Sequence, residues 1–523
     1  MKTWLSLHPY TKAAPSDFYY LRLCNDVADI LFSYDYFEIE LDLSDDEIKD
    51  LACFLTAYFE DVISGVGLWK AFTQQHLELY DTCLPFFSPD EYYQDEINPE
   101  DIMFLIWYYS SMVLYEERML SPAIFAEAPP VIDIFDLFFS EYEQAPENLK
   151  LKQMMEVAPD EDDFFMVRDR LRWILLDSWL LHFCRFNLEQ IIENELDEGA
   201  YGQMSEDNME ASAVEIADTY LFTSYTPLLA VKGKDWLSYS LGSGHPLFND
   251  ILDISEKIRG YFLFLGYEDN DLLFQHITTD TRLRVTARSL EMSDDCKVGK
   301  SILLIGFVKW KGEWWFSGTY AKFGYDRGLI ENVKASDSAG RLFGVDPVLL
   351  RKAVEEQNVS FLKYNKGKPI TYVGSQEEAG RFVQEYLIFH NDQLDISDKQ
   401  RKEARKKIQI ISEQKSFEKK TEVPDTVPGL VFFNPASGIE LAFGFNELIP
   451  GPDNPWFMEP DADDDTMRLL YSQYISKECL EYILEHEEVP GLGFPGEGGQ
   501  ELLTENLDFM IRFWKKKHYH SGS

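Results

Sequence analysis

Cysteine is scarce in this chain of 523 residues, which has only six. They are scattered and form no Cys-x-x-Cys pair, which excludes a disulfide framework and a cysteine-rich metal site. We therefore expect a reducing compartment, the cytoplasm, in which thiols pack as small apolar groups. The six cysteines are Cys24, Cys53, Cys83, Cys184, Cys296 and Cys479.

Long hydrophobic runs are also lacking. The most apolar stretch is Ile102–Tyr115, which is shorter than the ~20 residues that a membrane span requires. The first ten residues contain too short an apolar run for a signal peptide, and Pro9 interrupts it. We expect a buried helix at 102–115 and no membrane association.

Basic residues are few: 48 against 92 acidic residues, a net charge of −44. Residues 1–250 carry −34 and residues 421–523 carry −13, whereas residues 251–420 carry +3. Such acidity repels nucleic acids and anionic membranes, and it attracts basic proteins and cations. The alternative is that the charge only keeps an aromatic-rich chain in solution.

What the chain has in abundance is apolar and aromatic residues, 45% and 15% of the total. This composition and length are typical of a globular protein of about three domains. The predicted fold class is α+β multidomain, with an acidic all-α N-terminal domain, an antiparallel-sheet α+β middle domain and a small mixed C-terminal domain. The predicted divisions are an acidic helical domain at 1–225, an α+β domain at 226–392, a basic helical linker at 393–424 and an acidic domain at 425–523.

Helix signals dominate the first 200 residues. Asp17 is placed to cap a helix with an apolar face, and Ser44-Asp-Asp-Glu47 has the pattern of a capping box. Asn98-Pro99 should begin the apolar helix, because proline is favoured at the first helical position. A long amphipathic helix is predicted over 164–195.

Strand signals begin near residue 270. Residues 282–288 alternate between arginine or threonine and apolar side chains, as in a strand with one buried face. Residues 301–310 form an apolar run, and Lys311-Gly312 predicts a tight turn into a hairpin that ends at 320. Helices are expected at 249–263, 346–357 and 375–389.

Familiar cofactor motifs are incomplete. Gly299-Lys300-Ser301 lacks the first glycine of a P-loop, and a strand follows it. Gly491–Gly496 matches a dinucleotide fingerprint in letters but follows a helix, and Asp461–Asp465 lacks the glycine and glutamate of a calcium loop. No cofactor and no metal ion are expected.

Histidines beside acids are the candidates for catalysis. A carboxylate- or metal-dependent hydrolase would need such groups to meet in one pocket. The candidates are His390, Asp392, Asp395, His276 and Asp280.

Three arginines beside tryptophans give another alternative. Arg282, Arg284 and Arg288 share one predicted strand face, and basic and aromatic side chains together bind single-stranded nucleic acid. The acidic flanking regions would repel such a ligand, so we do not expect nucleic acid to be the partner.

Several segments resemble a family of large, acidic, uncharacterised proteins from gut Bacteroidetes. The similar segments are Trp4–Tyr10, Asp17–Asn25, the hairpin Trp310–Gly318 and the stretch from Gly438 to Pro455. The resemblance implies a bacterial, cytoplasmic protein, and it brings no activity and no catalytic residues.

The leading hypothesis is a non-enzymatic interaction protein that binds a partner protein of basic character through the acidic and aromatic surface of residues 1–200. Oligomeric state is left open. The acidic residues expected to contact the partner are Asp45, Asp46, Glu47, Asp160, Glu161, Asp162 and Asp163.

Overall fold

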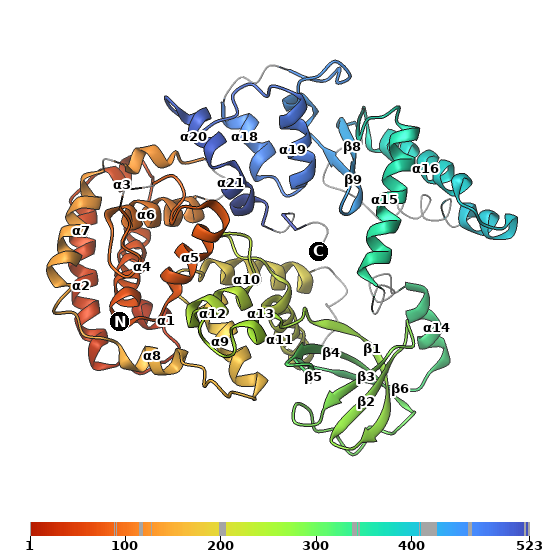
Figure 1. Cartoon of the computed structure of the whole chain (residues 1–523), viewed down its shortest axis with the longest axis horizontal. Helices are drawn as coiled ribbons and strands as arrows, with labels where there is room; N and C mark the ends of the chain where they lie inside the picture. Colours follow the sequence, from red (N-terminus) through yellow and green to blue (C-terminus); the bar gives the residue numbers. More distant parts are fainter. Residues whose placement is uncertain are drawn as a thin grey trace. The chain divides into compact units, whose positions relative to one another are not determined.

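The computed structural model divides the chain into two compact units (Figure 1). The first comprises Met1–Tyr115 and Pro122–Gly344, and the second comprises Glu116–Ser121 and Val345–Ser523. The structure describes residues 2–87, 89, 91–114, 119–126, 128–197, 206–336, 343, 346–406, 408, 426–458, 463–516 and 519–520.

The first unit opens with helices, as the sequence predicted. They surround a core rich in buried aromatic side chains, including Trp4, Tyr58, Phe59 and Trp107. The helices are α1 (Lys2–Ser6), α2 (Pro15–Phe32), α3 (Tyr36–Ile39), α4 (Asp45–Ser64), α5 (Leu68–Tyr80), α6 (Pro99–Val113), the 3-10 turn η1 (Pro122–Phe125), α7 (Pro129–Glu141), α8 (Leu149–Met155), α9 (Phe164–Leu176), α10 (Phe183–Asp197), α11 (Glu206–Thr223), α12 (Gly233–Leu241) and α13 (Phe248–Leu252).

Local signals set several helix starts correctly. Ser44 and Glu47 form the predicted capping box at α4, and α6 begins at Pro99 after Asn98. Asp17 is not a cap, however: α2 begins two residues earlier at Pro15, and Asp17 accepts a hydrogen bond from the Ala14 amide. The long helix expected over 164–195 is two helices, α9 and α10, separated by the turn at 177–182.

A six-stranded sheet follows in the same unit. Its strands are β1 (Ile258–Glu268), β2 (Asp271–His276), β3 (Arg282–Thr286), β4 (Ser301–Trp310), β5 (Glu313–Phe316) and β6 (Ala321–Gly324), and α14 (Arg327–Ser336) comes after them. The order is β1-β2-β3-β5-β4-β6, and β1 also pairs with β4, which closes the sheet on itself. All pairs are antiparallel except β3 with β5.

The predicted hairpin is confirmed as β4 and β5. Lys311 and Gly312 both have positive φ angles, 48° and 82°, which is the geometry of a two-residue type I′ turn. The enclosed core is built from side chains of all the main strands, among them Phe262, Phe274 and Phe307. Burial on both faces explains the uninterrupted apolar run of β4.

The helix expected at 249–263 is wrong beyond its first turn. α13 ends at Leu252, and residues 258–268 form β1, whose side chains alternate between buried and half-buried positions from Gly260 to Gly266. Phe262 and Phe264 point into the sheet core and their neighbours do not. This period of two is the strand pattern.

One buried lysine joins the helices of the first unit to its sheet. Lys257, which precedes β1, has a fully buried side chain, and its Nζ lies 2.7 Å from both Glu215 and Asp218 on α11. Glu215 also accepts a hydrogen bond from the Thr319 amide, and Asp218 accepts one from the Ser317 hydroxyl, both in the sheet region. Every charge in this cluster therefore has an opposite charge within reach.

The second unit combines helices with a three-stranded sheet. Its elements are α15 (Pro347–Tyr364), β7 (Ile370–Val373), α16 (Gln376–Gln393), β8 (Gly429–Asn434), β9 (Gly438–Phe443), the 3-10 turn η3 (Asn446–Leu448), α18 (Asp463–Tyr471), α19 (Lys477–His486), α20 (Gly499–Glu505) and α21 (Leu507–Trp514). The order is β7-β8-β9, and both pairs are antiparallel. Phe361, Tyr386 and Phe433 pack together between the two long helices and the sheet.

This sheet joins segments that the sequence prediction placed in different domains. β7 lies in the predicted 226–392 domain and β8 in the predicted 425–523 domain. Of the predicted linker at 393–424, residues 407 and 409–424 lie outside the described residues. The mixed α+β class itself is confirmed in both units.

Among the described helices, none taken alone is both long and apolar enough to cross a membrane. Only α4 and α5 together reach that length and composition, and they meet at an angle of 86°.

We predict that Lys257→Met lowers the free energy of unfolding by about 3–5 kcal/mol, because two buried carboxylates lose their shared counter-ion. Urea denaturation of the full chain measures the change. The matched control is Lys300→Met, which removes an exposed lysine and should change stability by less than ~0.5 kcal/mol. Equal effects of the two substitutions would contradict the role assigned to Lys257.

Candidate functional site

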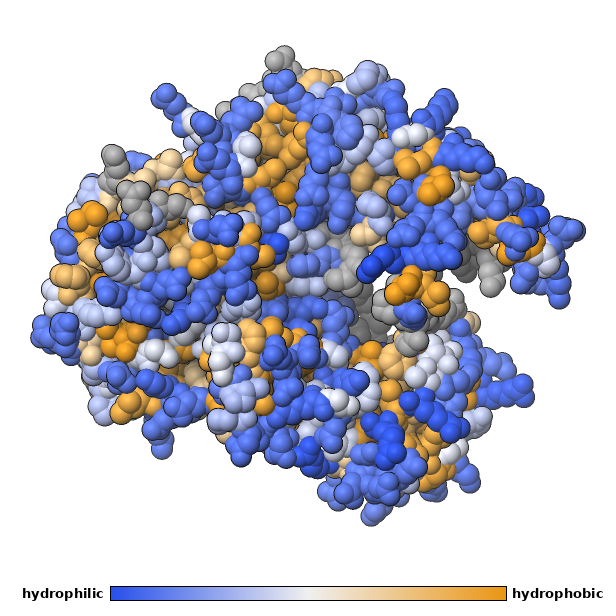
Figure 2. Space-filling view, in the orientation of Figure 1, coloured by the Kyte–Doolittle hydropathy of each residue, from blue (hydrophilic) through white to orange (hydrophobic). Residues whose placement is uncertain are grey.

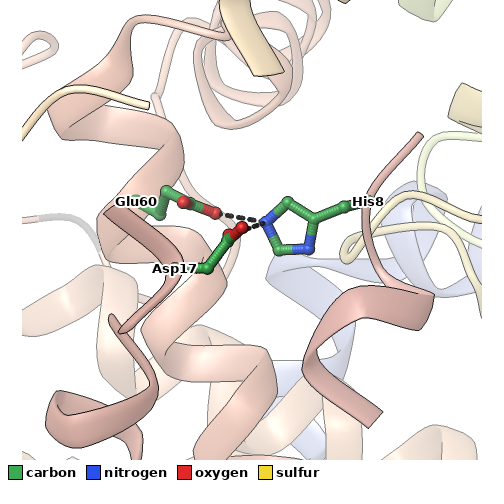
Figure 3. Close-up of side chains that lie close together, drawn as sticks. All are labelled: His8, Asp17 and Glu60. Carbon is green, nitrogen blue, oxygen red and sulfur yellow. Dashed lines mark hydrogen bonds and ion pairs between the residues drawn. The ribbon is translucent and has the colours of Figure 1, made fainter. Parts of the chain in front are cut away.

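A histidine and two carboxylates meet in the interior of the helical region (Figure 3). His8 follows α1, Asp17 lies in the first turn of α2 and Glu60 lies on α4. The Nε2 atom of His8 is 2.7 Å from Glu60 Oε2 and 3.8 Å from Asp17 Oδ1. The three side chains are at most 2% exposed, so solvent does not screen their charges.

The surroundings fix the protonation of His8. Its Nδ1 atom lies 2.8 Å from the Trp4 carbonyl oxygen, and its Nε2 atom faces carboxylate oxygens. Because carbonyl and ionised carboxylate oxygens only accept hydrogen bonds, both ring nitrogens must donate. Burial lowers the pKa of His8, but the hydrogen bond to Glu60 and its negative charge outweigh burial and raise the pKa above 6.5.

Further donors complete the cluster. Asp17 accepts hydrogen bonds from the Trp4 indole (3.1 Å) and the Tyr10 hydroxyl (3.0 Å). Asn148, which caps α8, donates to Glu60 Oε1 at 2.8 Å and to the Tyr10 oxygen at 2.6 Å. The network therefore ties the N-terminal segment to α2, α4 and the start of α8.

The chemistry open to this cluster is limited by those partners. One nitrogen and two carboxylate oxygens within 4.8 Å of one another form a ligand set that suits a transition-metal ion. A cation there would have to displace the proton on His8 Nε2 and compete with the indole, hydroxyl and amide donors. We assign the cluster to structure, as an internal ion pair whose strength depends on pH.

Two other buried acids have perturbed pKa values. Burial raises the pKa of Asp61 and of Asp101 to about 6 in each case. Asp61 accepts hydrogen bonds from the amides of Gly67 and Trp69, at the start of α5, and Asp101 accepts them from the hydroxyls of Tyr58 and Tyr92. Both carboxylates stabilise the first turn of a helix. Buried carboxylates with such a structural role also have perturbed pKa values, so the shift does not by itself indicate an active site.

The predicted hydrolase residues of the second unit are not brought together. His390 and Asp392 lie on α16, two residues apart and therefore on different faces, and Asp395 follows that helix. His390 stacks on Tyr386, whereas Asp392 pairs with Arg405 at 2.6 Å. Within the described part of the chain, no hydrogen bond or ion pair connects His390 with Asp392 or Asp395.

The other predicted pair occupies a turn of the six-stranded sheet. His276 ends β2, and its Nδ1 atom lies 2.9 Å from the Thr279 hydroxyl. Asp280 accepts hydrogen bonds from Lys334 and Gln275, and these lower its pKa. Both residues stabilise the connection from β2 to β3.

The acids expected to contact a partner differ in how far they already pair with other residues of the chain. Glu47 closes the capping box with Ser44, and Asp46 pairs with Lys49 at 3.1 Å, whereas Asp45 is exposed. In the second group, Asp160 is exposed and the Glu161 carbonyl accepts a hydrogen bond from Lys311.

The remaining two acids of that group have structural partners. Asp162 pairs with Arg288 at 2.9 Å, and Asp163 caps α9. Much of this acidity is therefore already engaged within the first unit.

The predicted nucleic-acid residues lie on β3 and just beyond it. Arg282 and Arg284 are exposed, and Arg284 is paired with Glu268 and Asp271. Arg288 lies over the Trp315 ring and pairs with Glu313. Trp310 and Trp315 are only 2% exposed, so their rings are core and cannot stack on bases.

An exposed apolar surface on α2 and α7 was missed by the sequence prediction. α7 buries Val131, Ile134 and Phe138, yet its opposite face exposes Ile132 (49%) and Phe139 (67%), with Phe135 stacked on Phe139. Phe18 on the adjacent helix α2 is 64% exposed. We call the exposed residues of the two helices the α2–α7 face.

Acidic residues accompany these apolar side chains. α2 and α7 together contain six acids and one base, and the exposed acids are Asp26, Asp29, Asp133 and Asp136. Figure 2 shows apolar patches among hydrophilic side chains along the edge where α2 and α7 lie in Figure 1. The sequence signal was the density of apolar residues in α7, which exceeds what one buried face needs.

Comparison with known proteins finds a similarity in the first half of the chain. Residues 1–254 are similar to a family described as "Protein of unknown function (DUF3843)". The matched segment holds all the helices from α1 to α13 and ends just before β1. Neither a curated protein nor a solved structure matches the chain.

We predict that His8→Gln destabilises the protein more at pH 6 than at pH 9, by about 1–3 kcal/mol at the lower pH. The stabilisation from protonated His8 is complete below pH 6.5 and is lost as the pH rises through the raised pKa of the folded state. Urea midpoints of both proteins from pH 6 to pH 9 measure this.

The matched control is His486→Gln, which replaces an exposed histidine. A destabilisation by His8→Gln that stays constant with pH would show that His8 is neutral in the folded protein.

Proposed function

We propose that this chain is a non-enzymatic, cytoplasmic interaction protein, and that its α2–α7 face binds a basic, amphipathic helical segment of a partner protein. The observation that carries the proposal is the double-sided character of α7. A helix that needs only one apolar face for its own core exposes Ile132 and Phe139 on the other.

The spacing on α7 favours a helical partner. Ile132, Phe135 and Phe139 are separated by three and four residues, so they form one stripe along the helix. The apolar face of an amphipathic helix presents side chains at the same spacing. Aromatic side chains in such a stripe contribute strongly to binding, because they bury much area and lose little conformational freedom.

Charge favours a basic partner. Asp133 and Asp136 flank the stripe on α7, and Asp26 and Asp29 lie on the exposed side of α2. Lysine and arginine side chains beside the apolar positions of a partner helix would meet these carboxylates, which speeds association and excludes acidic competitors.

The first test uses a synthetic 18-residue helical peptide of leucine and lysine, with a leucine–glutamate peptide as its counterpart. We expect the full chain to bind the lysine peptide more tightly, and Ile132→Ser/Phe139→Ser to weaken that binding about tenfold. Isothermal titration calorimetry measures both. Phe186→Ser, at a residue that is 59% exposed on α10, is the matched control and should bind like the unaltered chain.

Reversing charges at two different places distinguishes binding to a defined surface from nonspecific attraction by the acidic chain. Asp133→Lys/Asp136→Lys and Glu497→Lys/Glu501→Lys change the net charge equally, but only the first pair lies on the α2–α7 face. We expect the first variant alone to slow association and to flatten its salt dependence. Equal effects of the two variants would contradict the proposed face and leave only nonspecific attraction.

The natural partner is tested in the host cell. A photo-crosslinking phenylalanine analogue is incorporated in place of Phe139 or, in the control, in place of Phe186. The proposal requires a crosslinked partner peptide that is basic, is specific to position 139 and is lost in the Asp133→Lys/Asp136→Lys background. A crosslink to a second copy of this chain, or to its own second unit, would identify a different occupant and overturn the proposal.

A further inference from the structure

Two of the six cysteines lie in contact. Cys24 on α2 and Cys53 on α4 have their Sγ atoms 3.3 Å apart, and the two helices pack against each other. Both residues are largely buried, at 5% and 8% exposure. The other cysteines lie in different surroundings: Cys83 is near Gln94, Cys296 is near Ser293, and Cys184 and Cys479 are buried.

Contact between two thiols changes their reactivity. When one sulfur donates a hydrogen bond to the other, the acceptor is favoured as a thiolate, which is the nucleophilic form. The hydrogen bond from Cys53 is the main cause that lowers the pKa of Cys24, with Thr56 contributing, while burial opposes it. The hydrogen bond and burial together raise the pKa of Cys53.

We propose that Cys24 and Cys53 are an oxidation site, a dithiol that hydrogen peroxide converts to a disulfide between α2 and α4. The sulfurs need only approach from 3.3 Å to the bonding distance of about 2.05 Å, a movement within reach of side-chain rotation. A buried thiol packed only against apolar atoms would have no such partner.

The reaction proceeds in two balanced steps. The Cys24 thiolate attacks one peroxide oxygen, so that an S–O bond forms, the O–O bond breaks and hydroxide leaves, which takes up a proton as water. Cys53 then attacks the Cys24 sulfur: the S–S bond forms, the S–O bond breaks, and the oxygen leaves as water with the Cys53 proton. Two electrons pass from the two thiols to the peroxide, and two waters form.

The disulfide would lie on the inner side of α2, away from the exposed Phe18. It would fix α2 to α4 and close a loop that contains α3. Thiol reductants would reverse it, as expected for a modification in a reducing compartment. This inference does not depend on the proposed partner, because it concerns a different face of the helix.

The test treats the reduced full chain with hydrogen peroxide under native conditions, alkylates the remaining thiols in denaturant and digests with trypsin. We expect one disulfide-linked pair, formed by the tryptic peptides 23–49 and 50–70, with the other four cysteines alkylated. Dithiothreitol should restore six alkylated thiols. We expect the pair to oxidise about tenfold faster than Cys184 or Cys479, because the hydrogen bond between the two sulfurs favours the Cys24 thiolate.

Two cysteine substitutions test which residues form the disulfide. Cys53→Ser should abolish the linked peptides and leave Cys24 as a sulfenic acid that dimedone labels, whereas Cys296→Ser should leave the linkage unchanged. The unaltered chain decides the question even if a variant folds poorly. Six alkylated thiols after peroxide treatment, or linked peptides that do not join 23–49 to 50–70, would overturn the proposal.

Discussion

The contact of Lys257 with Glu215 and Asp218 is the interaction on which the first unit depends. Desolvation of an isolated ammonium ion costs several kcal/mol, and at Lys257, which has no exposed surface, two carboxylates offset this cost. The cluster also constrains the chain around it. A Cβ atom at Gly306 would lie 2.2 Å from Lys257 Cε, and one at Gly318 would lie 2.2 Å from Glu215 Oε2. The side chains of the ion pair lie so close to the backbone of the sheet region that both positions require glycine.

The need of a buried charge for hydrogen-bond or ionic partners divides the acids of the first 250 residues into two groups. Asp17, Glu60, Asp61 and Asp101 are buried and receive hydrogen bonds from histidine, tyrosine, tryptophan, amide or backbone donors. The second group is exposed and includes Asp133 and Asp136. The fold depends less on these side chains. The large negative charge is therefore partly a structural feature of the helical core and only partly a property of the surface that a partner meets.

Much of the fold could be predicted from local patterns. The capping box at Ser44, the proline start at Pro99 and the Lys311-Gly312 turn are set by residues within four positions of one another, so the sequence displays them directly. β1 was not predicted, because its aromatic residues are equally compatible with a helix. Only the pairing of this segment with β2 and β4 determines that it is a strand. The pairing of β7 with β8 was not predicted, because the two strands are more than fifty residues apart in the sequence.

The functional surfaces were harder to predict for a related reason. His8 and Glu60 are separated by 52 positions, and Cys24 and Cys53 by 29, so no motif spacing reveals either contact. The α2–α7 face is hidden in another way, because sequence shows that α7 is apolar but not which face the core covers. α2 links these features. It buries Asp17 and Cys24 on one side and exposes Phe18 on the other, so that its position against α4 determines both the internal network and the surface offered to a partner.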